Sequence, residues 1–168
     1  DDDLSRGLGD VYKRQSWDLA QPFRTLAHNG EINTLKGNIN WMKIHEQDMS
    51  SSLFKNVKDL KPVIRSSSDS GALDNVFELL VHSGKLAPLI KLMMIPDAWS
   101  KRSKTVPKNH QDLFNFLNST IEPWDGPAAI CATDAKWVLA SSDRNGLRPL
   151  RYSITSVSYT HLRAHETD

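Results

Sequence analysis

The sequence contains one cysteine, Cys131, among 168 residues. An internal disulfide is therefore excluded, and such sparse cysteine usage is typical of a reducing compartment, so we expect a cytoplasmic location. An excess of charge of one sign is also missing, because 21 basic and 20 acidic residues leave a net charge of +1. This balance predicts no broad electrostatic attraction to nucleic acid or to an acidic membrane.

Long apolar runs are absent as well. No stretch approaches the roughly 18 residues of a membrane-spanning helix, and no secretory signal peptide is recognisable. The sequence has no glycine-rich phosphate loop, and no His, Cys or carboxylate spacing indicates a metal site. What remains is an ordinary globular composition, with 39% hydrophobic residues, in a length that suits one domain.

The most informative stretch of sequence lies between residues 22 and 35. Phe23–Ala27 is apolar apart from one arginine and one threonine, which predicts a short, partly buried strand. Asn29-Gly30 then predicts a tight turn, because glycine adopts positive φ freely and asparagine tolerates it. An asparagine amide beside a free backbone N–H can donate two hydrogen bonds to one developing oxyanion. An ordinary turn without a catalytic task is the alternative, since this dipeptide is common in turns.

The remaining pattern predicts helices and a hairpin. Apolar residues at three–four spacing predict one helix over residues 34–47, a second that begins within 65–75 and ends before Gly84, and a third over 111–121. Asp69 or Ser70 is a candidate cap for the second helix. Two alternating segments, residues 127–133 and 136–141, predict a hairpin around Asp134-Ala135. Cys131 lies within its first strand, where a thiol usually behaves as a small buried hydrophobe, so we expect it in the core.

Two strings of sequence carry a specific resemblance to a known family. Residues 19–42 are LAQPFRTLAHNGEINTLKGNINWM, and residues 143–152 are DRNGLRPLRY. Both resemble the class II (N-terminal-nucleophile) glutamine amidotransferase domains, specifically the glutaminase part of glutamate synthase large subunits. The resemblance covers about residues 16–155. It implies an α+β fold, a partial αββα sandwich with two stacked antiparallel sheets between helical layers, and a short helix followed by a strand over residues 86–95.

The resemblance also implies roles for individual residues. Asn29 and the N–H of Gly30 are expected to form the oxyanion hole for glutamine hydrolysis. Asp69 is expected to bind the α-ammonium group of L-glutamine, and His28 is expected beside the same substrate. The general base in this family is the α-amino group of the catalytic cysteine, so His28 is not needed for that task.

Arginines occur twice in the second string. Arg144 and Arg148 are expected to pair with carboxylates such as Asp143 or Asp69, and a direct part in the glutamine site is the alternative. Asn145-Gly146 predicts another turn.

The two ends of the chain differ from the part between them. Residues 1–15 and 157–168 lack periodicity and resemble translated sequencing-adapter sequence, so we expect a native amidotransferase segment over residues 16–156. Native tails without a fold of their own are the alternative. The resemblance implies an N-terminal catalytic cysteine and an arginine for the glutamine α-carboxylate, both before Ser16. The arginine position falls on Leu8, so we expect a fragment that is inactive by itself.

For the parent enzyme, the resemblance implies hydrolysis of L-glutamine to glutamate and ammonia. Ammonia would pass to a synthase domain of the same chain and add to 2-oxoglutarate. That domain would use FMN and an iron–sulfur cluster, and no cofactor or metal is expected in this fragment. A small reductase subunit is expected if NADPH, and not ferredoxin, is the electron donor. The alternatives are another class II amidotransferase, such as a purine-pathway or hexosamine-forming one, and a non-catalytic glutamine-binding module.

Overall fold

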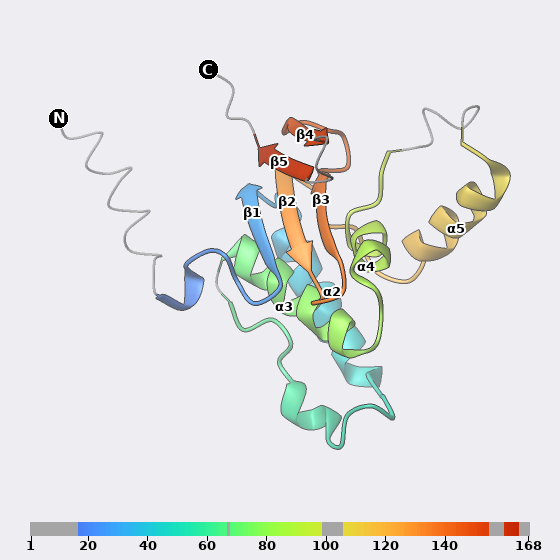
Figure 1. Cartoon of the computed structure of the whole chain (residues 1–168). Coiled ribbons are helices and arrows are strands. Elements are labelled where there is room, and N and C mark those ends of the chain that lie inside the picture. Colours follow the sequence, from blue (N-terminus) through green and yellow to red (C-terminus); the bar gives the residue numbers. More distant parts are fainter. Residues whose placement is uncertain (1–16, 67, 99–105, 155–159, 165–168) are drawn as a thin grey trace.

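The computed structural model describes residues 17–66, 68–98, 106–154 and 160–164. These residues form a mixed α+β structure in which helices pack against a small antiparallel sheet (Figure 1). This confirms the predicted α+β class. The helices are α2 (Leu35–Asp48), α3 (Asp69–His82), α4 (Ala87–Met94) and α5 (Lys108–Asn118), with short 3-10 turns η1 (Trp17–Leu19) and η2 (Val57–Leu60). The strands are β1 (Leu26–Gly30), β2 (Ala128–Thr133), β3 (Val138–Ser142), β4 (Leu150–Ile154) and β5 (Thr160–Ala164).

The main sheet has the order β1-β2-β3, so β1 is an edge strand. Its partner β2 lies about a hundred residues later in the chain. Leu26 pairs with Ala132 and Gly30 with Ala128, which places alternate residues of both strands on the same face. The face that carries Leu26 and Ile130 packs against α3 and α4 in one apolar core. The largest side chains in that core that are almost completely buried are those of Trp124, Leu73, Ile90, Met94 and Val76.

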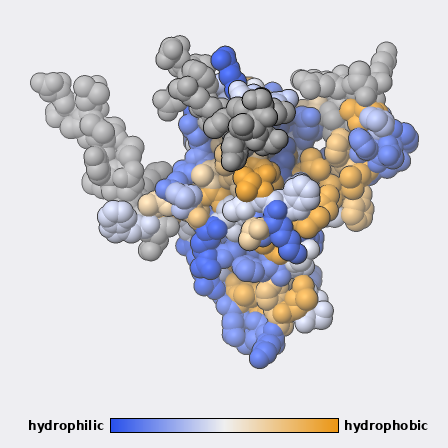
Figure 2. Space-filling view, viewed as in Figure 1, coloured by the Kyte–Doolittle hydropathy of each residue, from blue (hydrophilic) through white to orange (hydrophobic). Residues whose placement is uncertain are grey.

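The opposite face of the sheet carries Cys131, which is exposed. The prediction that this thiol lies in the core is wrong. β2 does alternate as expected, but the helices cover the face that carries Ile130 and Ala132, so the residue between them points the other way. Figure 2 shows that orange apolar side chains reach the molecular surface on this side of the protein and over α4 and α5.

Strand β1 begins later than predicted, because the backbone N–H groups near its start donate hydrogen bonds to a side chain of α3. The carboxylate of Asp74, on α3 and only 2% exposed, accepts hydrogen bonds from the N–H of Thr25 at 2.9 Å and of Leu26 at 3.1 Å. It also accepts from the Thr25 hydroxyl at 2.7 Å. These bonds fix the start of β1 on α3. The predicted strand Phe23–Ala27 is therefore displaced to Leu26–Gly30.

The predicted helices and hairpin are confirmed, with shifted ends. α2 and α3 match the predicted segments within a few residues, and the hairpin turns at Asp134 and Ala135, the latter with φ +68°. α5 begins at Lys108, three residues before the predicted start. The short helix over 86–95 is present as α4, but in the described part of the chain no strand follows it directly.

Residues 157–168 are predicted to lie outside the native segment, and tails without a fold of their own are the alternative. Within this end of the chain, Thr160–Ala164 forms β5, which pairs antiparallel with β4 in a separate two-stranded sheet. The domain boundaries at 16 and 156 stay predictions. Among the described residues, no helix is both long enough and apolar enough to cross a bilayer.

Candidate active site

Asn29 and Gly30 are the last two residues of β1, and not a turn as the dipeptide predicts. Gly30 does have a positive φ of +144°, which side-chain-bearing residues rarely adopt. A Cβ added to Gly30 would collide with the backbone carbonyl of Pro127, directly before β2. Glycine is therefore required here both by its dihedral angle and by the close approach of the neighbouring chain.

The N–H groups of β1 alternate between β2 and the open edge of the sheet. Leu26 and His28 direct theirs to the open edge, where the side chains of Asp74 and Gln21 accept them. Gly30 is two residues further along the strand, so its N–H is directed to the same edge. Its cross-strand neighbour Ala128 does not compete for it. The N–H and carbonyl of Ala128 bond instead to the carboxylate and the N–H of Asp143.

The side chain of Asn29 lies on the opposite face of β1 from His28. Its amide oxygen Oδ1 accepts a hydrogen bond at 3.0 Å from Nη1 of Arg148, a residue 119 positions later in the chain. Arg148 was expected to pair with a carboxylate. Within the described part of the chain its guanidinium instead bonds to this neutral amide, so that prediction is wrong. The contact also makes Arg148 a residue of the site that sequence reasoning did not assign.

The loop that carries Arg148 is organised by Asp143, which is 4% exposed. Its carboxylate accepts backbone N–H bonds from Ala128, Asn145, Leu147 and Arg148 at 2.9–3.0 Å. Burial by itself raises the pKa of this carboxyl, but the four N–H donors outweigh it and lower the pKa below its ordinary value of 3.8. The predicted turn at Asn145-Gly146 is confirmed, with φ +67° at the glycine.

The first turn of α3 lies beside the end of β1. Ser68 is the N-cap, and its hydroxyl accepts the N–H of Gly71 at 3.0 Å, so the prediction that Asp69 or Ser70 caps this helix is wrong. Asp69 is free of that task. Its Oδ2 accepts the N–H of Ile32 at 2.8 Å, two residues after Gly30. The carboxylate thus lies against the segment that follows the Asn29-Gly30 pair, near the positive end of the helix dipole.

His28 lies behind the site, with its side chain in the protein interior at 5% exposure. Its Nδ1 is 2.6 Å from the Ser70 hydroxyl, whereas its buried Nε2 has no hydrogen-bond partner among the described residues. Burial lowers the pKa of His28, with the Asp69 charge opposing this shift and the Arg148 charge adding to it. The buried imidazole of His28 therefore takes up a proton less readily than an exposed one, and it contacts the first turn of α3 through the Ser70 hydroxyl.

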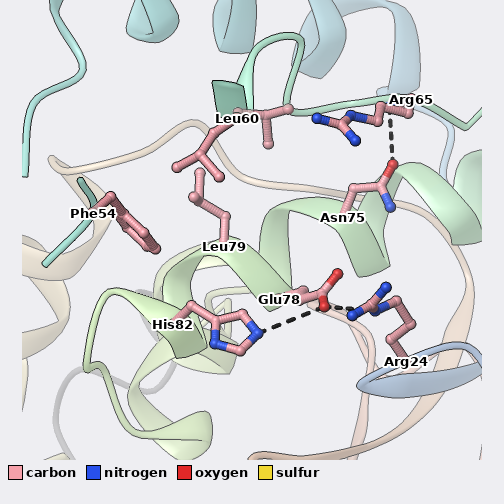
Figure 3. A pocket seen from close by; sticks show the side chains of 9 residues that line it. Arg24, Phe54, Leu60, Arg65, Asn75, Glu78, Leu79 and His82 are labelled. Atoms are coloured by element: carbon pink, nitrogen blue, oxygen red, sulfur yellow. Dashed lines mark hydrogen bonds and ion pairs between the residues drawn. The ribbon is translucent and has the colours of Figure 1, made fainter. Parts of the chain in front are cut away.

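A separate pocket lies at the other end of α3, with a volume of about 360 Å³ (Figure 3). The Glu78 carboxylate lies in this pocket. Its Oε1 is 2.6 Å from Nε of Arg24 and 3.6 Å from Nε2 of His82. Arg24 and Glu78 form an ion pair there, and none of the four site residues predicted from the sequence lines this pocket. The part of the chain that the structure describes also contains no group of three His, Cys, Asp or Glu side chains that could hold a metal ion.

Comparison with known proteins identifies the family. The family model described as glutamine amidotransferases class-II matches residues 13–166. The chain belongs to this family. The resemblance predicted from the two strings is confirmed, and the match extends past both ends of the predicted segment 16–156.

Class-II glutamine amidotransferase relatives include several glutamate synthases. The glutamate synthase [NADPH] large chain of Azospirillum brasilense is 57% identical over 143 residues, which cover 84% of this chain and 9% of that protein. The glutamate synthase [NADH] of Saccharomyces cerevisiae is 50% identical over 144 residues, covering 84% and 7%. The ferredoxin-dependent glutamate synthase of Antithamnion sp. is 44% identical over 149 residues, covering 87% and 10%. The chain therefore spans a tenth or less of the length of these relatives.

Proposed function

We propose that this segment forms the glutamine-hydrolysing site of a glutamate synthase. In the proposed site, the Nδ2 of Asn29 and the N–H of Gly30 stabilise the oxyanion that develops when the side-chain amide of L-glutamine is attacked. Asp69 binds the α-ammonium group of the same substrate. The observation that carries the proposal is the hydrogen bond from Arg148 to Oδ1 of Asn29, because it leaves the Asn29 NH2 group to donate elsewhere.

The position of Asp69 supports its share of the proposal. Its Oδ2 accepts the N–H of Ile32, while Oδ1 receives only a long contact of 3.4 Å from the Ser70 hydroxyl. An ionised carboxylate accepts several hydrogen bonds, so Asp69 retains capacity for an ammonium donor. His28 contributes to substrate binding by supporting the first turn of α3 through Ser70.

The fold proposed for the complete domain is the αββα sandwich. The exposed face of β2, with Cys131 at its surface, supports this, because a second sheet would cover it. The described residues form one three-stranded sheet and one two-stranded sheet, which would be parts of this sandwich.

The attacking thiolate is proposed to come from outside residues 1–168. The one cysteine in the sequence, Cys131, lies within β2, so its α-nitrogen is part of a peptide bond and is not a free base. The 168-residue polypeptide alone should therefore release no ammonia from glutamine. Sustained glutaminase activity of the purified chain would contradict this assignment.

The wider reaction is proposed from the relatives. Ammonia would pass to a synthase region of the same polypeptide and add to 2-oxoglutarate, with FMN and an iron–sulfur cluster carrying the electrons. An iron–sulfur cluster needs several cysteine thiolates. A single cysteine in this chain does not fit that need, so the cluster would belong to another region. A small reductase subunit would deliver electrons if the donor is NADPH, as in the name of the Azospirillum brasilense relative.

The decisive experiment replaces Asn29 in a full-length enzyme that carries this segment. Asn29→Ala should lower kcat for glutamine hydrolysis by about 10²–10³-fold, the usual cost of removing one oxyanion donor. Asn145→Ala is the matched control, because Asn145 also precedes a glycine but is exposed in the turn after β3. An unchanged kcat for Asn29→Ala would remove this residue from the proposed role. Binding of glutamine without any hydrolysis by the unmodified enzyme would favour a non-catalytic module.

A further inference from the structure

We propose that Arg148 is a positioning residue that fixes the Asn29 amide with its NH2 group toward the developing oxyanion. This inference rests on the proposed function, because it concerns how the oxyanion hole is set before the substrate arrives. Neither the family match nor the relatives assign a task to this side chain.

The chemistry of the contact determines the orientation of the amide. A guanidinium group only donates hydrogen bonds, and an asparagine amide offers one accepting oxygen and one donating nitrogen. With Nη1 of Arg148 at 3.0 Å, the Asn29 oxygen must be the atom that faces the guanidinium. Rotation of the amide by half a turn would place NH2 against a cation donor. The nitrogen is therefore held on the side away from Arg148.

The guanidinium is itself held in place through its own backbone. The buried carboxylate of Asp143 accepts the N–H of Leu147 at 3.0 Å and of Arg148 at 2.9 Å, and it accepts the N–H of Ala128 at 3.0 Å. Because Ala128 pairs with Gly30 across the sheet, one carboxylate joins the Arg148 loop to the strand beside the second oxyanion donor. Asp143 therefore contacts both the loop that carries Arg148 and the strand residue opposite Gly30.

Preorganisation is what makes such a site effective. A donor that is already aimed at the oxyanion costs no reorganisation when charge develops, whereas a freely rotating amide spends much of its time with oxygen toward the negative charge. Losing Arg148 should therefore affect the transition state more than the ground state. A direct contact of Arg148 with the glutamine carboxylate would instead affect substrate binding.

Side-chain NMR of the 168-residue chain tests the orientation without any catalysis. The Asn29 Nδ2 resonances are assigned by their loss in Asn29→Asp. Arg148→Gln should lower the order parameter of the Asn29 NH2 group, while Arg151→Gln, at an exposed arginine of β4, should leave it unchanged. An Asn29 amide that is equally ordered in Arg148→Gln would overturn the inference, even if the glutaminase function is correct.

Kinetics of a full-length enzyme that carries this segment tests the consequence. Arg148→Gln should lower kcat for glutamine hydrolysis by about 10-fold to 100-fold, as supporting partners of a site typically do, with little change in KM. Arg148→Lys should recover part of the loss, and added guanidinium ion should raise the rate of Arg148→Ala but not of the unmodified enzyme. A raised KM with unchanged kcat would overturn the inference and place Arg148 on the substrate. Lack of glutaminase activity in the unmodified enzyme would instead contradict the proposed function.

Discussion

The hydroxyl oxygen of Ser70 lies 2.6 Å from Nδ1 of His28, and this contact ties the first turn of α3 to the strand residue that directly precedes Asn29. The neighbouring Asp69 accepts the N–H of Ile32 on the other side of the Asn29-Gly30 pair. Two consecutive helix residues therefore hold the chain on both sides of the proposed oxyanion hole. Changes in this pair should alter the stability of the fold as well as the geometry of the site.

Ser70→Ala should destabilise the chain by about 1–3 kcal/mol, because it leaves a second ring nitrogen of the buried His28 without a partner. Ser119→Ala is the control, since the exposed Ser119 hydroxyl bonds to the carbonyl of Phe116 at the end of α5. That change should stay within about 0.5 kcal/mol. Urea unfolding followed by circular dichroism measures both values. Equal losses for the two variants would show that the Ser70–His28 contact contributes nothing.

The depressed pKa of His28 predicts that the chain loses stability in mild acid. The folded state holds the pKa of His28 below its ordinary value of 6.5, so the unfolded chain takes up the proton first. The contribution to the free energy of unfolding is complete above pH 6.5 and is lost as the pH falls through the folded-state pKa. The groups that face His28 are Asp69, whose charge opposes the shift, and Arg148, whose charge strengthens it.

A pH series of urea unfolding curves measures this loss, with His28→Gln and His82→Gln compared against the unmodified chain. His82 is the control because its side chain is largely exposed, near Glu78 at the far end of α3, so its removal leaves the buried imidazole in place. His28→Gln should flatten the pH dependence below pH 6.5, and His82→Gln should not. Asp143 does not confuse the comparison, because its pKa is lowered from 3.8 and its contribution disappears only at lower pH.

Gly30→Ala and Gly37→Ala should have opposite effects on stability. At Gly30 a methyl group would collide with the Pro127 carbonyl, and alanine would also be strained at a φ of +144°. Strain and overpacking together should lower the free energy of unfolding by about 2–5 kcal/mol. At Gly37, within α2, a methyl group meets nothing within 4 Å. Higher helix propensity should then stabilise the chain by up to about 1 kcal/mol. Thermal unfolding measures both. A tolerated Gly30→Ala would contradict the close approach of β1 to Pro127.

Asp69→Asn should raise KM for glutamine in a full-length enzyme by about 10-fold to 100-fold, because the amide keeps the size of the carboxylate but loses its charge. The fall in kcat should be smaller, since the α-ammonium group is equally charged in the ground state and the transition state. Glutaramate, which has the side-chain amide but lacks the α-amino group, is the matched substrate. Its kcat/KM should be nearly the same for the unmodified enzyme and for the Asp69→Asn variant. A comparable loss with both substrates would contradict an ammonium-binding role.

Much of the local structure could be predicted from the residues in order. Helices α2 and α3 and the hairpin of β2 and β3 follow from apolar spacing and turn dipeptides, because these signals act within a few residues. The family could be recognised from two short strings. The strand that contains Asn29-Gly30 could not be placed correctly, since its start depends on Asp74, which lies 49 positions after Thr25.

The site itself shows where local pattern is insufficient. The residues of β2 alternate between two faces of the sheet as predicted, but the pattern does not say which face the helices cover. The prediction therefore placed Cys131 on the covered face, whereas it lies on the exposed face. Asn29 and Arg148 stand 119 positions apart, and no spacing rule connects them.

The order of residues alone was enough for the family, which two strings identify by resemblance, and for the helices, because apolar periodicity and short-range sterics act along the chain. The tertiary structure alone decided the direction of the Asn29 amide, the burial of His28 and the contact of the Asp69 carboxylate with the N–H of Ile32. Each of these depends on two residues that lie far apart in the chain and are brought close by packing: Arg148 with Asn29, Ser70 with His28, and Asp69 with Ile32.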